Sequence, residues 1–131
     1  AARQAGVRSP LAELLIDKAA IRALSRGLGF PWWDKPAQPC LASRFPYGES
    51  ISAERLKRVG QAEAWLIARG FSSVRVRSHG LAARIEVPSE QIRTVLALAE
   101  SEPLVEAFRA LGFTSVNLDL EGLVSGKLNR R

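Results

Sequence analysis

The stretch VRVRSHGLAARIEV, residues 74–87, decides the fold that this sequence predicts. Valine and arginine alternate at its start, so Arg75 and Arg77 lie on one face of a strand and the valines on the other. Gly80 permits a turn, and residues 83–87 then form a second strand. The stretch therefore predicts an antiparallel hairpin with one apolar face and one charged face.

Helical patterns lie on both sides of the hairpin. Before it, Ser52 is a suitable N-cap for an apolar helical stripe that ends at Gly70. After it, the spacing of apolar residues predicts helices over 92–99 and 104–111, and then a third strand over 113–120. The sequence therefore predicts a small α+β domain, with a three-stranded, mostly antiparallel sheet and helices on one side of it.

The first 50 residues are less regular. Asp17 is the expected N-cap of a helix that ends at Gly29. The segment 30–50 contains four prolines, so we expect an irregular loop there. Its aromatic residues are expected to order it, and these are Trp32, Trp33, Phe45 and Tyr47. A loop of this length is usually functional, and it lies where a domain boundary would fall.

The composition is that of a soluble globular protein with a basic surface. The chain has 131 residues, is 47% hydrophobic and carries a net charge of +6, most of it from arginine. Arginine binds phosphate and carboxylate through paired hydrogen bonds, so a nucleic acid, a nucleotide or a phosphorylated small molecule is a candidate partner. A solvated basic surface explains the same charge. With no membrane-length apolar run and no signal peptide, we expect a cytoplasmic protein.

Cys40 is the only cysteine of the chain. It cannot form an internal disulfide, and one thiolate is too few for a zinc or iron–sulfur site. Arg44 follows four residues later, and a neighbouring cation favours the nucleophilic thiolate. Cys40 is therefore either a chemically used sulfur or a buried, inert residue.

Three further charged residues are candidates for a site. Arg75 and Arg77 either bind a phosphate together or are neutralised by Glu86 across the hairpin. Glu63 lies beside the apolar stripe of its helix, where it is either a general base or cation ligand, or the partner of an arginine.

The chain lacks two features that a complete ATP-dependent enzyme would have, a phosphate-binding loop and an initiating methionine. The sequence contains no glycine-rich phosphate-binding loop, so we do not expect this chain to bind ATP productively by itself. It begins with alanine and contains no methionine, which predicts a fragment of a longer protein.

Two stretches resemble the sequence pattern of a known protein family: LGFPWWDKPA at 28–37 and CLASRFPYG at 40–48. Three further segments match the same pattern in the same order, and these are residues 74–77, 83–87 and 118–122. The chain resembles the LarE family of ATP-dependent sacrificial sulfur transferases, which belong to the PP-loop pyrophosphatase superfamily. The resemblance implies that residues 1–40 are the C-terminal end of a PP-loop α/β domain. It also implies that residues 41–131 are the C-terminal α+β domain.

The resemblance implies that the protein transfers sulfur. Such enzymes adenylate a carboxylate of a pyridinium dicarboxylate mononucleotide, and the cysteine that matches Cys40 attacks the acyl-adenylate. Cleavage of the cysteine Cβ–S bond then leaves sulfur on the substrate and dehydroalanine in the protein. Two such sulfurs build the nickel-pincer cofactor of lactate racemase. ATP and Mg²⁺ would be bound by an upstream domain that this chain lacks, and a single cysteine predicts no iron–sulfur cluster.

The resemblance also assigns roles to named residues and partners. Ser43, Arg44 and Glu63 match catalytic positions of the family, and Arg75 and Arg77 match positions that hold the substrate phosphate. No metal ligand is assigned. A homo-oligomer is implied, whereas a membrane or nucleic-acid partner is not.

The sequence departs from the family pattern at Leu123 and Val124, where an aromatic residue and then an arginine are usual. One phosphate contact is therefore lost, or the substrate preference differs. Two other interpretations stay open. The chain can be a fragment of a PP-loop tRNA thiouridine synthase, which its charge would suit, although those enzymes commonly use a second cysteine. It can also be a non-catalytic module that binds an anion or assembles oligomers.

Overall fold

The computed structural model describes residues 4, 6–35 and 39–124 of a chain that divides into two compact units. Unit 1 comprises residues 1–38 and unit 2 comprises residues 39–131. Pro36 and Ala37, which are part of the stretch that resembles LarE, lie outside the described residues. Throughout the described ranges, every helix is too short or too polar to cross a lipid bilayer.

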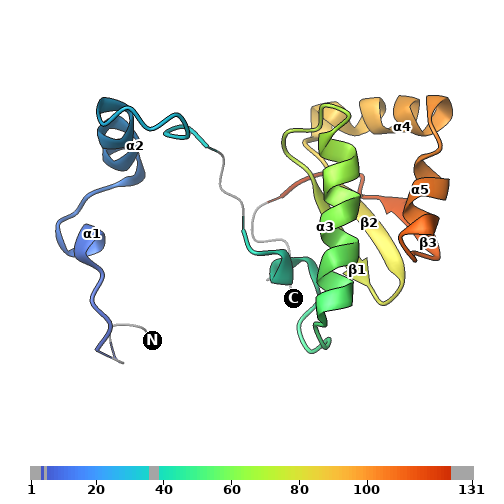
Figure 1. The fold of residues 1–131 in the computed structure, drawn as a ribbon, viewed down its shortest axis with the longest axis horizontal. Helices are drawn as coiled ribbons and strands as arrows, with labels where there is room; N and C mark the ends of the chain where they lie inside the picture. The colour runs from blue at the N-terminus through green and yellow to red at the C-terminus, as the bar shows by residue number, and fades with distance from the viewer. Residues whose placement is uncertain (1–3, 5, 36–38, 125–131) are drawn as a thin grey trace. The chain divides into compact units, whose positions relative to one another are not determined.

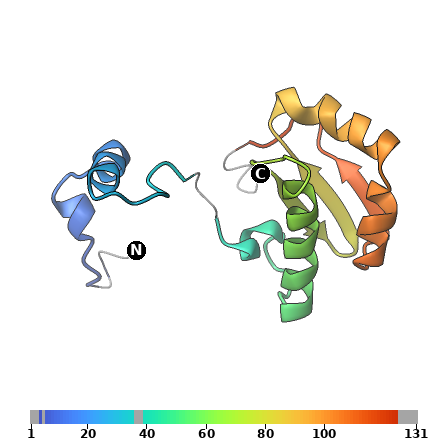
Figure 2. The ribbon, with the colours of Figure 1, turned by 45° about the horizontal axis from the view of Figure 1, so that its top comes forward.

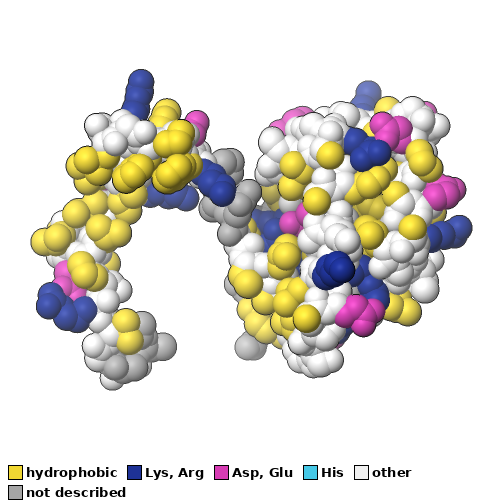
Figure 3. Space-filling view, in the orientation of Figure 1, with side chains coloured by type: hydrophobic (Ala, Val, Ile, Leu, Met, Phe, Trp, Pro, Cys, Tyr) yellow, Lys and Arg dark blue, Asp and Glu magenta, His cyan; other side chains and the backbone are white. Residues whose placement is uncertain are grey.

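Unit 1 contains two helices, α1 (Pro10–Glu13) and α2 (Lys18–Gly27). The predicted N-cap of α2 is confirmed, because the Asp17 side chain accepts a 2.8 Å hydrogen bond from the amide of Ala20. None of the described residues of unit 1 is buried, and Figure 3 shows hydrophobic side chains gathered on its surface. The described part of unit 1 thus contains no buried core, and two helices do not show a PP-loop fold. The assignment of residues 1–40 to a PP-loop domain stays a prediction.

Unit 2 is a small α+β domain, as predicted (Figure 1). In chain order its elements are the 3₁₀ turn η2 (Leu41–Arg44), α3 (Ala53–Ile67), β1 (Arg75–His79), β2 (Ala82–Glu86), the 3₁₀ turn η3 (Ser89–Gln91), α4 (Ile92–Ser101), α5 (Leu104–Ala110) and β3 (Ser115–Leu118). Ser52 caps α3 as expected, since its side chain accepts a hydrogen bond from the amide of Arg55.

The sheet has the strand order β1-β2-β3 and is mixed rather than mostly antiparallel. β1 and β2 form the predicted antiparallel hairpin, in which Arg77 is opposite Arg84. β3 pairs with β2 in parallel, with Asn117 opposite Arg84. The prediction was wrong here for a topological reason. The two helices α4 and α5 form a crossover that returns the chain to the end of the sheet where β2 began, and such a connection makes the next strand parallel.

The hydrophobic core lies on one face of this sheet. Val76 of β1 and Ile85 of β2 are opposite each other and almost completely buried. They belong to one cluster with residues of all three helices of unit 2: Val59, Ala62 and Leu66 of α3, Val95 of α4, and Leu104 and Phe108 of α5. Because side chains alternate along a strand, Arg75, Arg77, Arg84 and Glu86 lie on the opposite face.

The turn η2 packs against α3 and against β1, one of the two edge strands of the sheet (Figures 1 and 2). Gly60 of α3 permits this approach, because a Cβ atom at that position would lie 3.3 Å from Cδ1 of Leu41. Phe45 is buried and orders the segment, as predicted. Trp32 is 62% exposed but stacks on Phe30, and Tyr47 is 83% exposed, so neither adds to a buried core as Phe45 does.

Candidate functional site

Cys40 lies directly before η2, in its N-cap position. Its thiol is free and exposed, which favours a chemically used sulfur over a buried, inert cysteine. Its backbone is nevertheless held in place. The carbonyl oxygen of Cys40 accepts hydrogen bonds from the amide of Ser43 at 2.9 Å and from the hydroxyl of Ser43 at 2.8 Å. An accessible sulfur is thus attached to an ordered backbone.

A chain of hydrogen bonds runs from Cys40 into the protein through Ser43, Arg44 and Glu63. Nη1 of Arg44 donates to the Ser43 hydroxyl oxygen at 3.0 Å and to the carbonyl of Pro39 at 3.3 Å. Nε and Nη2 of Arg44 donate to the two carboxylate oxygens of Glu63, at 2.6 and 3.1 Å. The four residues that the sequence resemblance marked as catalytic are therefore connected in one network.

Glu63 acts in this network as the partner of an arginine. Its Oε1 accepts from Arg44 and also from the amide of Val76, at 2.9 Å, and its Oε2 accepts from Arg44. Both the arginine and the carboxylate are buried. Of the interpretations left open by the sequence, the geometry therefore favours an ion pair that joins η2 to α3 and to the free edge of β1.

Arg77 approaches the same turn from the sheet. Its Nε donates to Oε1 of Glu86 at 2.5 Å, and its Nη1 donates to the carbonyl of Ser43 at 3.0 Å. Arg77 is 3% exposed and Glu86 is fully buried. The expected neutralisation by Glu86 is thus present for Arg77, but on a covered face rather than a solvated one. Arg77 and Arg44 hold the η2 turn from two directions.

Arg75 differs from Arg77, although both were predicted on the same face. Arg75 is half-buried, and no hydrogen bond or ion pair of its guanidinium is present among the described residues. Its burial, together with the nearby charges of Arg44 and Arg77, lowers the pKa of Arg75. Binding an anion there would relieve this repulsion.

The charges of this region do not balance. Arg84 contacts Oε1 of Glu86 at 3.3 Å and Oδ2 of Asp119 at 3.4 Å. With the pairs described above, four arginines (Arg44, Arg75, Arg77 and Arg84) face three carboxylates (Glu63, Glu86 and Asp119). Among the ion pairs of the described residues, Arg75 is thus the one arginine of the four that is not paired with a carboxylate. Sequence reasoning missed the parts of Arg84 and Asp119 in this cluster and the burial of Glu86, which it had placed across the hairpin from the two arginines.

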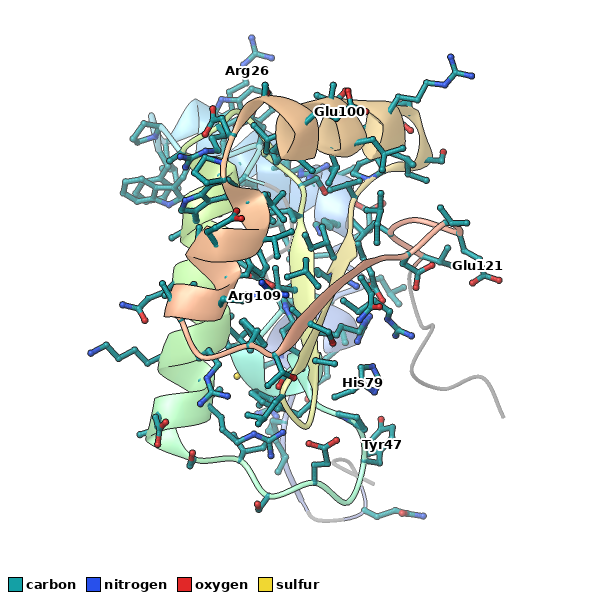
Figure 4. The ribbon with its side chains drawn as sticks, turned by 90° about the vertical axis from the view of Figure 1, so that its right-hand side faces the viewer. Arg26, Tyr47, His79, Glu100, Arg109 and Glu121 are labelled. Atoms are coloured by element: carbon teal, nitrogen blue, oxygen red, sulfur yellow. The ribbon has the colours of Figure 1, made fainter. Side chains whose placement is uncertain are left out.

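Another titratable group lies at the end of the charged face. Figure 4 shows His79 near the turn of the β1–β2 hairpin, and Tyr47 on the loop that follows η2. The pKa of His79 is lowered by partial burial and by the charge of Arg84. This favours a neutral imidazole, and the sequence had assigned His79 no role.

Metal ligands are a separate question. Within the ranges that the structure describes, no three His, Cys, Asp or Glu side chains come together as a metal site would require. The binding of ATP and Mg²⁺ by an upstream domain stays a prediction.

No family model matches the chain. It is 57% identical over 130 residues to the uncharacterized protein slr1717 of Synechocystis sp., an alignment that covers 99% of this chain and 48% of that protein. It is 40% identical over 126 residues to the pyridinium-3,5-bisthiocarboxylic acid mononucleotide synthase of Lactiplantibacillus plantarum, covering 96% of this chain and 45% of that enzyme. It is 29% identical over 115 residues to the uncharacterized protein MJ0830 of Methanocaldococcus jannaschii, covering 88% of this chain and 44% of that protein.

The chain thus spans just under half the length of these curated relatives. Nearly all of its own residues are aligned to them. The chain is therefore homologous, over almost its whole length, to part of the pyridinium-3,5-bisthiocarboxylic acid mononucleotide synthase of Lactiplantibacillus plantarum.

Proposed function

We propose that this chain is the sulfur-donating part of an ATP-dependent sulfur transferase, in which Cys40 gives up its own sulfur. The substrate is a pyridinium dicarboxylate mononucleotide, and the product is a precursor of a nickel-pincer cofactor. The observation that carries the proposal is the exposed Cys40 thiol on a backbone held by Ser43 and, through it, by Arg44 and Glu63. The homology to a synthase of a pyridinium thiocarboxylate mononucleotide supports the substrate class.

The proposed reaction has two stages. ATP and Mg²⁺ would be bound by residues outside this chain, where the substrate carboxylate would attack the α-phosphate of ATP, so that an acyl-adenylate forms and pyrophosphate leaves. The Cys40 thiolate attacks the acyl carbon, so that a thioester forms and AMP leaves. The Cβ–S bond of Cys40 then breaks, which leaves a thiocarboxylate on the substrate and dehydroalanine at position 40.

Of the two arginines expected to bind the substrate phosphate, Arg75 has the free guanidinium. Arg77 uses Nε on Glu86 and Nη1 on the carbonyl of Ser43, whereas Arg75 has no such partner among the described residues. We therefore assign the main phosphate contact to Arg75. Arg77 contributes its charge and holds the turn that carries Cys40.

The test is intact mass spectrometry of the protein as its gene encodes it, incubated with ATP, Mg²⁺ and the pyridinium dicarboxylate mononucleotide. A parallel sample of this chain receives the preformed acyl-adenylate, which removes the need for an ATP site. The expected result is loss of the mass of H₂S, mapped to Cys40, with AMP release, and Cys40→Ala is the matched control. A thiolated substrate with unchanged protein mass would show that the sulfur comes from elsewhere.

Absence of both changes would favour the other interpretations. Binding of bulk tRNA with a steep salt dependence would indicate the tRNA thiouridine synthase. Figure 3 shows Lys and Arg side chains interspersed with Asp and Glu on the visible face of unit 2, and no broad basic patch is seen on that face. The visible face of unit 2 thus gives no specific support for RNA binding, and the predicted homo-oligomer stays a prediction.

A further inference from the structure

We infer that Ser43 is a catalytic residue that stabilises negative charge on the Cys40 carbonyl oxygen while the Cβ–S bond of Cys40 breaks. This inference rests on the proposed function and adds to it the means by which elimination is made possible. Its starting point is that the Cys40 carbonyl oxygen receives two hydrogen bonds from a single residue, one from the Ser43 amide and one from the Ser43 hydroxyl.

The chemistry of the second stage explains why this oxygen matters. A base, either a carboxylate or hydroxide, removes the Cα proton of the acylated Cys40. The electron pair of the Cα–H bond moves into the Cα–C bond and onto the carbonyl oxygen, which gives an enolate. The enolate then reforms the carbonyl and the Cα–Cβ double bond while the Cβ–S electrons leave with the thiocarboxylate. The base retains the proton, and nothing is oxidised or reduced overall. The enolate oxygen is therefore where charge develops.

The geometry matches what an oxyanion needs. The two donors of Ser43 lie 2.9 and 2.8 Å from the Cys40 oxygen, within the range of about 2.7–3.1 Å expected for groups that stabilise an oxyanion. A 3₁₀ turn by itself supplies only the amide donor. The hydroxyl is an additional donor, and it belongs to a residue that the sequence resemblance marked without giving it a role.

Arg44 strengthens the hydroxyl donor. Its Nη1 donates to the Ser43 hydroxyl oxygen at 3.0 Å, and this polarises the O–H bond toward the Cys40 oxygen. Arg44 is 5% exposed, so water screens its charge little. Glu63 fixes the guanidinium through two hydrogen bonds. Arg44 and Glu63 are thus positioning residues that act through Ser43.

The peptide on the other side of Ser43 is held as well. Its carbonyl oxygen accepts the 3.0 Å hydrogen bond from Nη1 of Arg77. Both the amide and the hydroxyl of Ser43 are therefore oriented before any charge develops, so little reorganisation is needed during the reaction.

A chemical test separates this inference from the proposed function. A dibromide that alkylates a cysteine twice gives a cyclic sulfonium, which eliminates to dehydroalanine without ATP or substrate. The chain has one cysteine and no methionine, so intact mass reports Cys40 alone. Ser43→Thr and Ser43→Val form a matched pair, because their side chains have the same shape and differ in the hydroxyl group. Circular dichroism establishes that both variants are folded.

We expect the Ser43→Val sulfonium to eliminate roughly ten- to a hundredfold more slowly than the wild type, and Ser43→Thr to stay within a few fold of it. In denaturant the three rates should be equal, since the hydroxyl then has no fixed position. Equal rates in the folded proteins, or the same difference in denaturant, would overturn the inference. If Ser43→Val fails to fold, Ser43→Ala replaces it in the same comparison.

An enzymatic arm uses the preformed acyl-adenylate. Ser43→Val should release AMP at the wild-type rate but accumulate the thioester adduct, seen as added mass on Cys40, while dehydroalanine appears slowly. Wild-type protein that forms neither adduct nor dehydroalanine would contradict the proposed function alone. Wild-type and Ser43→Val proteins that form dehydroalanine equally fast would contradict the role of Ser43 alone.

Discussion

The guanidinium of Arg44 and the carboxylate of Glu63 form a bidentate ion pair that is almost completely removed from solvent. Nε lies 2.6 Å from Oε1 and Nη2 lies 3.1 Å from Oε2, and the two side chains are 5% and 10% exposed. The pair joins the turn after Cys40 to the middle of α3. Because Oε1 also accepts from the Val76 amide, one carboxylate connects a turn, a helix and a sheet edge.

Glu63→Gln should destabilise unit 2 strongly. The amide leaves Arg44 buried with an uncompensated charge, which costs about 3–5 kcal/mol in folding free energy. Glu54→Gln is the matched control, because Glu54 pairs with Arg58 on the same helix but is 82% exposed, and its loss should cost less than about 1 kcal/mol. Urea unfolding followed by circular dichroism measures both. Similar losses for the two variants would show that the buried pair contributes no more than a surface pair.

Arg75→Gln and Arg77→Gln should differ in their effect on the free energy of unfolding. Arg77→Gln weakens the pairing of the fully buried Glu86 and should lower the free energy of unfolding by about 3 kcal/mol. Arg75→Gln removes a cation whose pKa is lowered by burial and by Arg44 and Arg77, so stability should stay within about 0.5 kcal/mol or rise. Thermal and urea unfolding provide the measurement. A large loss in Arg75→Gln would mean that this guanidinium has a stabilising partner.

Inorganic phosphate should raise the melting temperature of the chain through Arg75. A ligand that binds only the folded state stabilises it in proportion to the logarithm of its concentration. The increase should be lost in Arg75→Gln and retained in Arg69→Gln, which removes an arginine paired with Glu102 elsewhere in unit 2. Chloride at the same ionic strength serves as the reference, since general screening affects both variants alike. An equal increase in both variants would argue against a phosphate site at Arg75.

Gly122→Ala should be strongly destabilising. Gly122 has a φ of +73°, and a Cβ atom there would lie 2.7 Å from the carbonyl oxygen of Val87. That oxygen accepts a 2.8 Å hydrogen bond from the Leu123 amide, so the contact cannot relax without breaking it. We expect a loss of more than about 2 kcal/mol. Gly70→Ala is the control, because Gly70 has a φ of +94° but nothing within 4 Å of the added Cβ, and it should lose about 1 kcal/mol. Equal losses would show that the steric contact relaxes freely.

The local structure of unit 2 was predictable because it depends on neighbours along the chain. Ser52 caps α3 through an amide three residues away, and the alternation from Val74 to Arg77 places both arginines on one strand face. Such choices follow from backbone geometry and short-range hydrogen bonds. The direction of β3 was predicted wrongly because it does not depend on neighbours along the chain. No short-range signal shows whether β3 pairs in parallel or antiparallel with β2, which lies two helices earlier.

The sequence by itself therefore determined the β1–β2 hairpin and the helices α2 to α5, and the family resemblance marked Ser43, Arg44 and Glu63 beside Cys40. Only the tertiary structure decided their partners. Glu63 binds Arg44 over a separation of 19 residues, and Arg77 binds the Ser43 carbonyl over 34. Arg75 and Arg77 lie on the same strand face, yet Arg77 forms an ion pair with Glu86 and Arg75 does not. The physical reason is that an ion pair between residues far apart in the sequence depends on which elements pack together when the chain folds. At this site η2 packs against the open edge of β1.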